Sequence, residues 1–290
     1  MSGSAASSRS FLPAGEVAAA FVAARREARA LPAYPGPLPA TLADGYAVQD
    51  AALALWGERP VGWKVGRVPP ELQGRLGEQR VAGPVFARNL WRASPGRTLD
   101  FPVFEGGFAA VEGEFVYRMA VDAPAGRTQW TADDALALVS GLHIGVETAG
   151  SPLATINALG STVVASDFGN NWGLIVGPEV SGWRELAFAD MPCETFIDGA
   201  SVGAGTAASL PDGPAEALAW LLGHAAARGL PLKAGDLVTT GAVTGVHDIT
   251  AGQQSRVSFG RFGEILCRAV PARPIGPGEE GNAHEHDDAG

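Results

Sequence analysis

The stretch Val111-Glu112-Gly113-Glu114-Phe115-Val116-Tyr117 places two glutamates on either side of one glycine. If the stretch is an extended strand, alternate side chains share a face, so Glu112 and Glu114 lie side by side. Two inward-facing carboxylates repel each other and are costly to desolvate unless a cation or a shared proton compensates. A hard divalent cation, Mg²⁺ or Mn²⁺, prefers such oxygen ligands. The alternative is a solvated edge strand whose two acids face water, and the pattern alone leaves both open.

The chain has 290 residues, enough for one large domain or two small ones with a substantial core. No uninterrupted apolar run reaches the roughly 18 residues that a membrane span needs. The first ten residues lack the apolar segment of a secretory signal. The two cysteines, Cys193 and Cys267, form no CxxC and suggest neither a disulfide framework nor a thiolate zinc site. We therefore expect a soluble, cytoplasmic protein.

The acidic balance of the chain narrows the class of partner. A formal net charge of −10 argues against a general nucleic-acid surface. With no membrane segment either, the expected partner is a small molecule.

The N-terminal part, residues 14–59, is expected to form a small helical lobe. Apolar residues recur at spacings of three and four over residues 15–31, where Pro32 ends the pattern. A second helix is expected to open at Thr41, with Asp44 three positions on as its capping partner. Residues 1–13 and the Gly-, Pro- and acid-rich tail, residues 273–290, are expected to be disordered.

Residues 60–272 read as a β-rich domain. Short apolar runs punctuated by glycine and proline predict strands. These strands cover residues 61–65, 114–119, 173–176, 194–197, 236–240, 256–259 and 265–270. Two helices are expected among them, at residues 131–142 and 214–227. Many irregularly connected strands favour an α+β fold with a mixed β-rich core over a doubly wound sheet.

Six motifs occur in an order typical of one family. They are Thr41-Leu42-Ala43-Asp44-Gly45-Tyr46-Ala47-Val48-Gln49, Gly62-Trp63-Lys64-Val65-Gly66, Val111-Glu112-Gly113-Glu114-Phe115, Gly145-Val146-Glu147, Gly173-Leu174-Ile175-Val176-Gly177 and Gly235-Asp236-Leu237-Val238-Thr239-Thr240-Gly241. On these motifs the chain resembles the 2-keto-4-pentenoate hydratase and 4-oxalocrotonate decarboxylase family of the fumarylacetoacetate hydrolase superfamily. The resemblance covers most of the chain and implies the β-rich fold of that superfamily's C-terminal domain.

The resemblance implies a metal site. The family's ligands correspond here to Glu112, Glu114 and Glu147, which would hold Mg²⁺ or Mn²⁺. Lys64 corresponds to the family's proton-shuttling lysine, although strand alternation by itself predicts a solvent-facing side chain. Thr240 and Gly241 match the loop that receives the substrate carboxylate, and Trp63 is expected beside it.

The chain departs from the family pattern near the lysine. An acid that pairs with the lysine is expected just before Phe86, but the sequence there is Arg80-Val81-Ala82-Gly83. Glu71 or Asp167 could take its place in space. In the segment that follows residue 165, Asn171 is a candidate for the position of a family hydroxyl. Asp167 and Asn171 are therefore further candidate catalytic residues, with turn formation as the alternative.

The leading hypothesis is a metal-dependent lyase acting on a small 2-oxo or 2-hydroxy-dienoic acid through a metal-stabilised enolate. Hydration is placed ahead of decarboxylation, tautomerisation or C–C hydrolysis. The second hypothesis is a non-catalytic member that binds a 2-oxo acid or partners an active homologue. By the resemblance we also expect a homo-oligomer, with a complex with a homologous subunit as a further possibility.

Overall fold

The computed structural model describes residues 14–276, so the disorder expected for residues 1–13 and for most of 273–290 lies outside the described residues. The helices are α1 (Ala14–Arg26), α2 (Leu42–Trp56), α3 (Pro70–Leu76), α4 (Ala132–Leu136), α5 (Ile156–Leu159), α6 (Ser161–Ser166) and α7 (Pro214–Ala227). The strands are β1 (Gly62–Arg67), β2 (Arg80–Val85), β3 (Leu90–Arg92), β4 (Thr98–Val103), β5 (Phe108–Met119), β6 (Val139–Ser151), β7 (Asn171–Glu179), β8 (Pro192–Ile197), β9 (Ala200–Thr206), β10 (Leu237–Thr239), β11 (His247–Asp248), β12 (Gln254–Ser258) and β13 (Glu264–Pro271).

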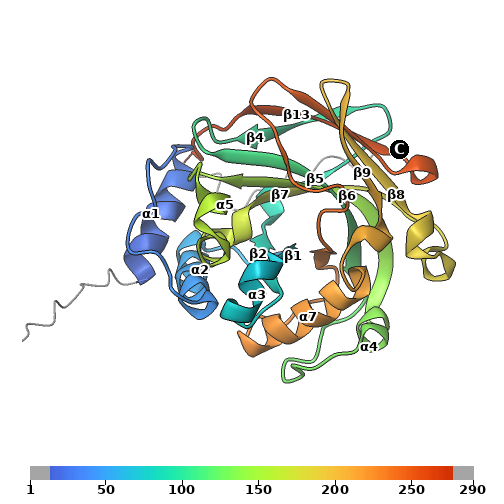
Figure 1. Cartoon of the computed structure of the whole chain (residues 1–290), viewed down its shortest axis with the longest axis horizontal. Helices are drawn as coiled ribbons and strands as arrows, with labels where there is room; N and C mark the ends of the chain where they lie inside the picture. The colour runs from blue at the N-terminus through green and yellow to red at the C-terminus, as the bar shows by residue number, and fades with distance from the viewer. Residues whose placement is uncertain (1–13, 277–290) are drawn as a thin grey trace, which may run out of the picture.

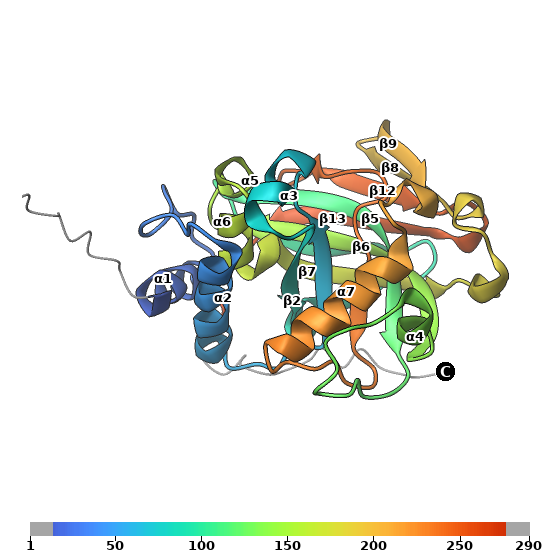
Figure 2. The same cartoon turned by 60° about the horizontal axis from the view of Figure 1, so that its bottom comes forward.

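Two mixed sheets form the centre of the molecule. The larger, eight-stranded sheet has the order β2-β1-β10-β5-β6-β7-β3, with β11 also paired to β5. The smaller has the order β4-β13-β12-β8-β9. The N-terminal helices lie at one end, and α7 runs beside the large sheet with its C-terminal part against α2, where the rings of His224 and Tyr46 are 4.6 Å apart (Figures 1 and 2). The expected α+β architecture with a mixed β-rich core is confirmed.

One face of the large sheet packs against the small sheet. Phe115 on β5 meets Phe259 edge-on, with ring centroids 5.4 Å apart. Gly113, two residues earlier, points the same way, and a Cβ built on it would lie 2.5 Å from Cys193 Sγ and 2.9 Å from Val257 Cγ1. The two sheets therefore approach closely where a glycine separates the two glutamates.

The opposite face of the large sheet holds the polar site. Because side chains alternate along β5, residues 112, 114 and 116 point away from the small sheet. Val116 packs there in a small apolar cluster with Val85, Leu174, Val176 and Leu237. This cluster therefore lies on the same face of the large sheet as Glu112 and Glu114.

Helices α1 and α2 pack directly on the β-rich part and share a core cluster with it. Thr41 caps α2, and the capping box with Asp44 is present as expected. Farther along α2, the Tyr46 hydroxyl accepts from the backbone N–H of Ala82 and Gln49 donates to the Ala82 carbonyl, at 2.9 and 3.0 Å. Since β2 is an edge strand, these bonds satisfy backbone groups that would otherwise have no strand partner.

Helix limits were only partly predicted. The helix expected at 214–227 is confirmed as α7, but the one expected at 15–31 ends at Arg26. The helix expected at 131–142 is wrong beyond Leu136, since Val139 already begins β6. Pairing with β5, which sets Leu142 opposite Tyr117, outweighs the local helix signal. Within residues 14–276 no helix is long and apolar enough to cross a bilayer.

Replacing Gly113 by alanine should destabilise the fold. The added methyl group overpacks the contact between the sheets, which costs about 1–3 kcal/mol. We expect a melting temperature lower by several degrees, measured by calorimetry, since roughly 2–4 °C accompany each kcal/mol in a domain of this size. Gly74→Ala is the control, because nothing lies within 4 Å of a Cβ there. Equal melting temperatures for the two variants would contradict the close sheet contact.

Candidate metal centre

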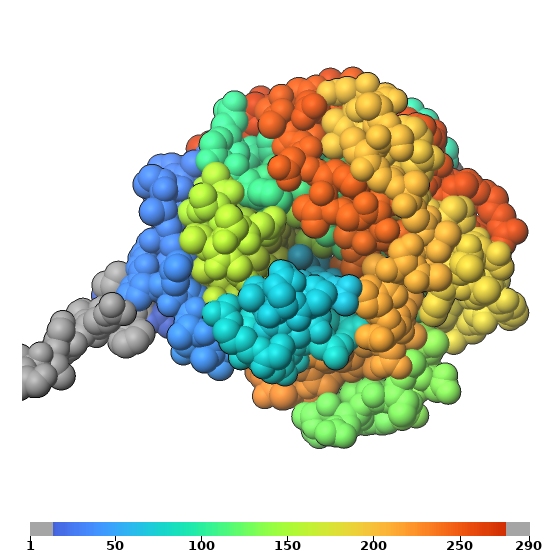
Figure 3. Space-filling view, in the orientation of Figure 1, coloured from blue at the N-terminus to red at the C-terminus, as the bar shows by residue number. Residues whose placement is uncertain are grey.

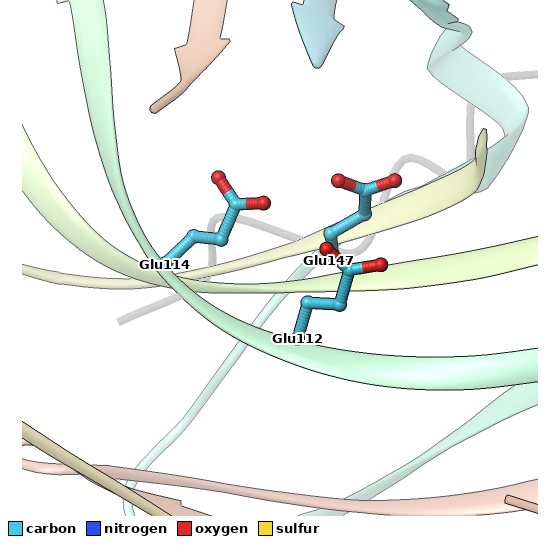
Figure 4. Close-up of side chains that lie close together, drawn as sticks. All are labelled: Glu112, Glu114 and Glu147. Atoms are coloured by element: carbon cyan, nitrogen blue, oxygen red, sulfur yellow. The ribbon is translucent and has the colours of Figure 1, made fainter. Parts of the chain in front are cut away.

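Three buried carboxylates converge on the polar face of the large sheet. Glu112 and Glu114 extend from β5, and Glu147 on the neighbouring β6 is the register partner of Glu112. Oxygen atoms from all three lie within 4.8 Å of one another (Figure 4). Glu112 is 6% exposed, and Glu114 and Glu147 are fully buried. The solvated-edge alternative is therefore wrong, because β5 is a central strand.

The donor set fits a divalent cation. Glu114 Oε1 and Glu147 Oε2 have no hydrogen-bond partner among the described residues, and Glu147 Oε1 has the Lys64 ammonium 3.3 Å away. Glu114 Oε2 accepts the backbone N–H of Gly241 at 2.8 Å, which fixes the orientation of that carboxylate. Buried acceptors without donors are costly, and a cation with oxygen ligands would satisfy them. The three glutamates would hold it.

Crowding of the carboxylates changes their acidity. Burial raises the pKa of Glu112 to about 8, with the charge of Glu147 adding to the shift and Lys64 opposing it. Burial, followed by the charges of Glu147 and Glu112, also raises the pKa of Glu114 well above its ordinary value. The metal-free site therefore retains protons that a cation would displace.

Lys64 points into the site and away from solvent. Its side chain on β1 is buried, and Nζ lies 3.3 Å from Glu147 Oε1. Burial alone would lower the pKa of Lys64, but Glu147, Glu112 and Glu114 outweigh it and raise the pKa. The absence of a side chain at Gly66 makes space for the ammonium, since a Cβ there would lie 3.3 Å from Nζ. The solvent-facing alternative for Lys64 is excluded.

A cavity of about 750 Å³ opens from this site to the surface. Its walls come from β1 and β2, from α3, from the α5–α6 segment and from the loop after β10, and Figure 3 shows the hollow between these segments. Lys64, Glu112, Thr240 and Gly241 line it. The sequence motifs at residues 62–66, 111–115 and 235–241 are thus brought together.

Thr240 and Gly241 line the cavity, but their donors are used within the protein. The Thr240 hydroxyl donates to the Phe115 carbonyl at 2.9 Å, and the Gly241 N–H donates to Glu114. A substrate carboxylate would find neither donor free. In this arrangement the two residues position β5 and its carboxylate.

Trp63, Asp167 and Asn171 do not line the cavity. Strand alternation turns Trp63 to the face opposite Lys64, where it is buried with the Arg228 guanidinium 5.7 Å from its ring. Asp167 is buried and accepts from Arg25 Nε at 2.7 Å and from the Ser151 hydroxyl at 2.6 Å. The contacts of Trp63 and Asp167 are therefore with other parts of the protein, away from the cavity that Lys64 and Glu112 line.

Asn170, and not Asn171, reaches the cavity from this segment. Residues 168–170 form the 3₁₀ turn η2 (Phe168–Asn170), and all three have positive φ. A left-handed turn changes the direction of the side chains that follow it, and the positions of residues in the sequence do not reveal this change. The run Phe168-Gly169-Asn170-Asn171 offered only the turn-forming residues Gly and Asn as a signal.

Residues 80–83, where the acid was expected, contribute Arg80 and Val81 to the cavity wall, with Val81 beside Gly66. Asp167 does not replace it, because Arg25 and Ser151 hold its carboxylate elsewhere. Glu71 lines the cavity from α3 as an exposed side chain. Lys64 therefore has the metal-site glutamates as its acidic neighbours.

Residues 93–270, more than half of the chain, match the fumarylacetoacetate hydrolase C-terminal family. The chain belongs to this family. Among similar solved structures is 4-oxalocrotonate decarboxylase from Pseudomonas putida G7, complexed with calcium and acetate, at 19% identity and a TM-score of 0.70 over 89% of this chain and 97% of that one. Fumarylpyruvate hydrolase from Pseudomonas aeruginosa, with Mn²⁺ and pyruvate, aligns at 18% identity and a TM-score of 0.55 over 72% and 89% of the two chains. The shared fold thus occurs in a decarboxylase and a hydrolase.

Glu114→Gln should abolish metal binding while keeping the fold. The amide preserves shape and can still accept from Gly241, but it removes a charged ligand. We expect Mg²⁺ and Mn²⁺ affinity measured by calorimetry to fall by at least about 100-fold, since even residues behind the ligands are worth 10–100-fold. Glu105→Gln, an exposed glutamate before β5, is the control. Unchanged affinity in Glu114→Gln would show that the cluster is not a metal site.

The metal-free protein should lose stability as pH rises. In the unfolded chain Glu112 loses its proton around its ordinary pKa of 4.5, whereas in the folded protein its pKa is raised to about 8. Between these two values folding takes up a proton, so the folded state loses stability as pH rises. We expect the melting temperature in EDTA to fall by at least about 2 °C over this window. Saturating Mg²⁺ should reduce the fall, and Glu112→Gln should remove part of it. A rise with pH in EDTA would contradict these protonation states.

Proposed function

We propose that the protein is a divalent-metal-dependent lyase that forms an enolate from a small 2-oxo acid, with Mg²⁺ or Mn²⁺ as cofactor. The observation that supports this most directly is the buried carboxylate triad, of which Glu112 lines an open cavity together with Lys64, the ion-pair partner of Glu147. A cation held by Glu112, Glu114 and Glu147 would act as a Lewis acid toward the carboxylate and carbonyl oxygens of such an acid.

Lys64 supplies the proton chemistry of this proposal. Its ammonium lies against Glu147 and faces the cavity, so it is placed to stabilise negative charge that develops on the substrate and to donate a proton to it. Burial removes competing water around the ammonium, which strengthens that interaction. Val65 and Val81 contribute apolar wall on either side.

The absence of an acid at Val81 favours decarboxylation over the hydration expected from the sequence. Adding water to a double bond requires a group that activates the water, and a family acid would stand where Val81 lies. In decarboxylation of a 2-oxo-3-enedioic acid, the bond to the distal carboxylate breaks and its electron pair moves through the double bond to the C2 oxygen. CO₂ leaves, and a single proton completes the 2-hydroxy-dienoate. Lys64 alone can give that proton.

The test is turnover of two substrates in Mg²⁺ and in EDTA. A 2-oxo-3-enedioate should release CO₂ only with metal, whereas a 2-hydroxy-2,4-dienoate should gain no water. Lys64→Met should reduce kcat by roughly 100-fold or more, the usual worth of a proton-transferring residue. Oxalate, a flat mimic of an enolate, should still bind the variant in the presence of Mg²⁺.

Four outcomes would count against the proposal. Turnover in EDTA would remove the metal from the reaction, and full activity of Lys64→Met would remove the lysine. Hydration of the dienoate without CO₂ release from the enedioate would restore the hydratase function. Loss of both activities with intact oxalate binding would indicate the non-catalytic binding protein.

A further inference from the structure

The turn η2 has a backbone that the residues in it rarely adopt. Phe168, Gly169 and Asn170 have φ angles of 50°, 65° and 62° in succession. For the bulky Phe168 this left-handed conformation is strained, whereas Asn tolerates it; strain of this kind persists where surrounding contacts enforce it, often at functional sites. Contacts with other segments must therefore hold the turn in this conformation.

Contacts on both sides enforce the turn. A Cβ on Gly83 would lie 1.9 Å from the Phe168 carbonyl oxygen, so β2 accepts the turn only through a glycine. Before the turn, Arg25 from α1 binds Asp167, and after it Arg25 Nη1 donates to the Asn171 carbonyl at 3.1 Å. The guanidinium is 1% exposed. Gly83 is also the register partner of Lys64, which places the turn beside the lysine's strand.

Asn170, at the end of the turn, is one of the residues that line the cavity. Asn170 is 4% exposed and its Nδ2 donates to Asn157 Oδ1 at 3.2 Å. Its Oδ1 has no partner among the described residues, and one bond leaves the second N–H hydrogen of Nδ2 unused. The O and N atoms of both side-chain amides can also be exchanged by a half-turn. Asn170 Oδ1 then accepts from Asn157 Nδ2, and both N–H groups of Asn170 Nδ2 can donate to another acceptor. An oxygen atom of a ligand would complete the arrangement.

This wall of the cavity is polar but uncharged. Ser161 and Val164 of α6 line the same cavity as the two asparagines. The cationic groups that line the cavity are Lys64, at the metal centre, and Arg67 and Arg80. Arg80 is committed to the Pro211 carbonyl and to Asp212, at 3.3 and 3.6 Å, and Arg67 is exposed.

We propose that Asn170 is the specificity-determining residue of the cavity, donating a hydrogen bond to a second, distal carboxylate of a 2-oxo diacid. The inference rests on the proposed function, which places the 2-oxo end of the substrate at the glutamates. A neutral amide suits a carboxylate that is to leave as CO₂, because a guanidinium would stabilise the charged ground state and not the neutral product. The cavity volume leaves room for the longer acid.

The experiment compares two unreactive probes of equal chain length, 2-oxoadipate and 2-oxohexanoate, by calorimetry in saturating Mg²⁺. The wild-type protein should prefer the diacid by roughly 10- to 100-fold, the worth of one hydrogen bond to a charged group. Asn170→Gly, which tolerates the positive φ, should reduce the preference to within about threefold of unity. Asn170→Asp should reverse it, because a carboxylate then faces a carboxylate.

Asn171→Ala is the matched control, since this neighbouring buried asparagine does not line the cavity. It should keep the full preference, and every variant should keep wild-type affinity for oxalate and an unchanged melting temperature. A preference that survives in Asn170→Gly, or that is lost in Arg67→Ala instead, overturns the inference while the proposed function stands. Failure of the wild-type protein to bind oxalate with Mg²⁺ overturns both.

Discussion

The mutual repulsion of Glu112, Glu114 and Glu147 is the constraint on which the rest of the site depends. Three buried carboxylates within 4.8 Å cannot all be ionised at low cost without compensation. The structure supplies part of it through Lys64 and the Gly241 N–H, and retained protons supply more. A divalent cation would supply the remainder, so the same repulsion that disfavours the empty site favours the metal.

Strand β5 links this site to the stability of the whole fold. One set of alternate residues, including Gly113 and Phe115, closes the contact between the sheets, while the other set carries the glutamates. The register with β6 then places Glu147 opposite Glu112. A shift of one residue would turn every side chain to the wrong face, so packing of the apolar face also fixes the ligand geometry.

The N-terminal helices contribute to the cavity although none of their residues lines it. Helix α2 holds the edge strand β2 through Tyr46 and Gln49, and β2 forms part of the cavity wall. Helix α1 sends Arg25 to Asp167 and so fixes the turn that presents Asn170. Helices α1 and α2 therefore support the wall of the candidate metal centre and the turn that carries the proposed carboxylate subsite.

The sequence by itself determined the features that depend on neighbouring residues: the cap of α2 at Thr41, the limits of α7, and the shared face of Glu112 and Glu114. Glu147 was predicted as a metal ligand only from the family resemblance, because no local sequence pattern indicates that its strand pairs with β5. Only the tertiary structure decided that Lys64 turns inward and that Asn170 reaches the cavity in place of Asn171. Those outcomes depend on which surfaces meet across the sheet, and on a left-handed turn enforced by Gly83 and Arg25 from distant parts of the chain.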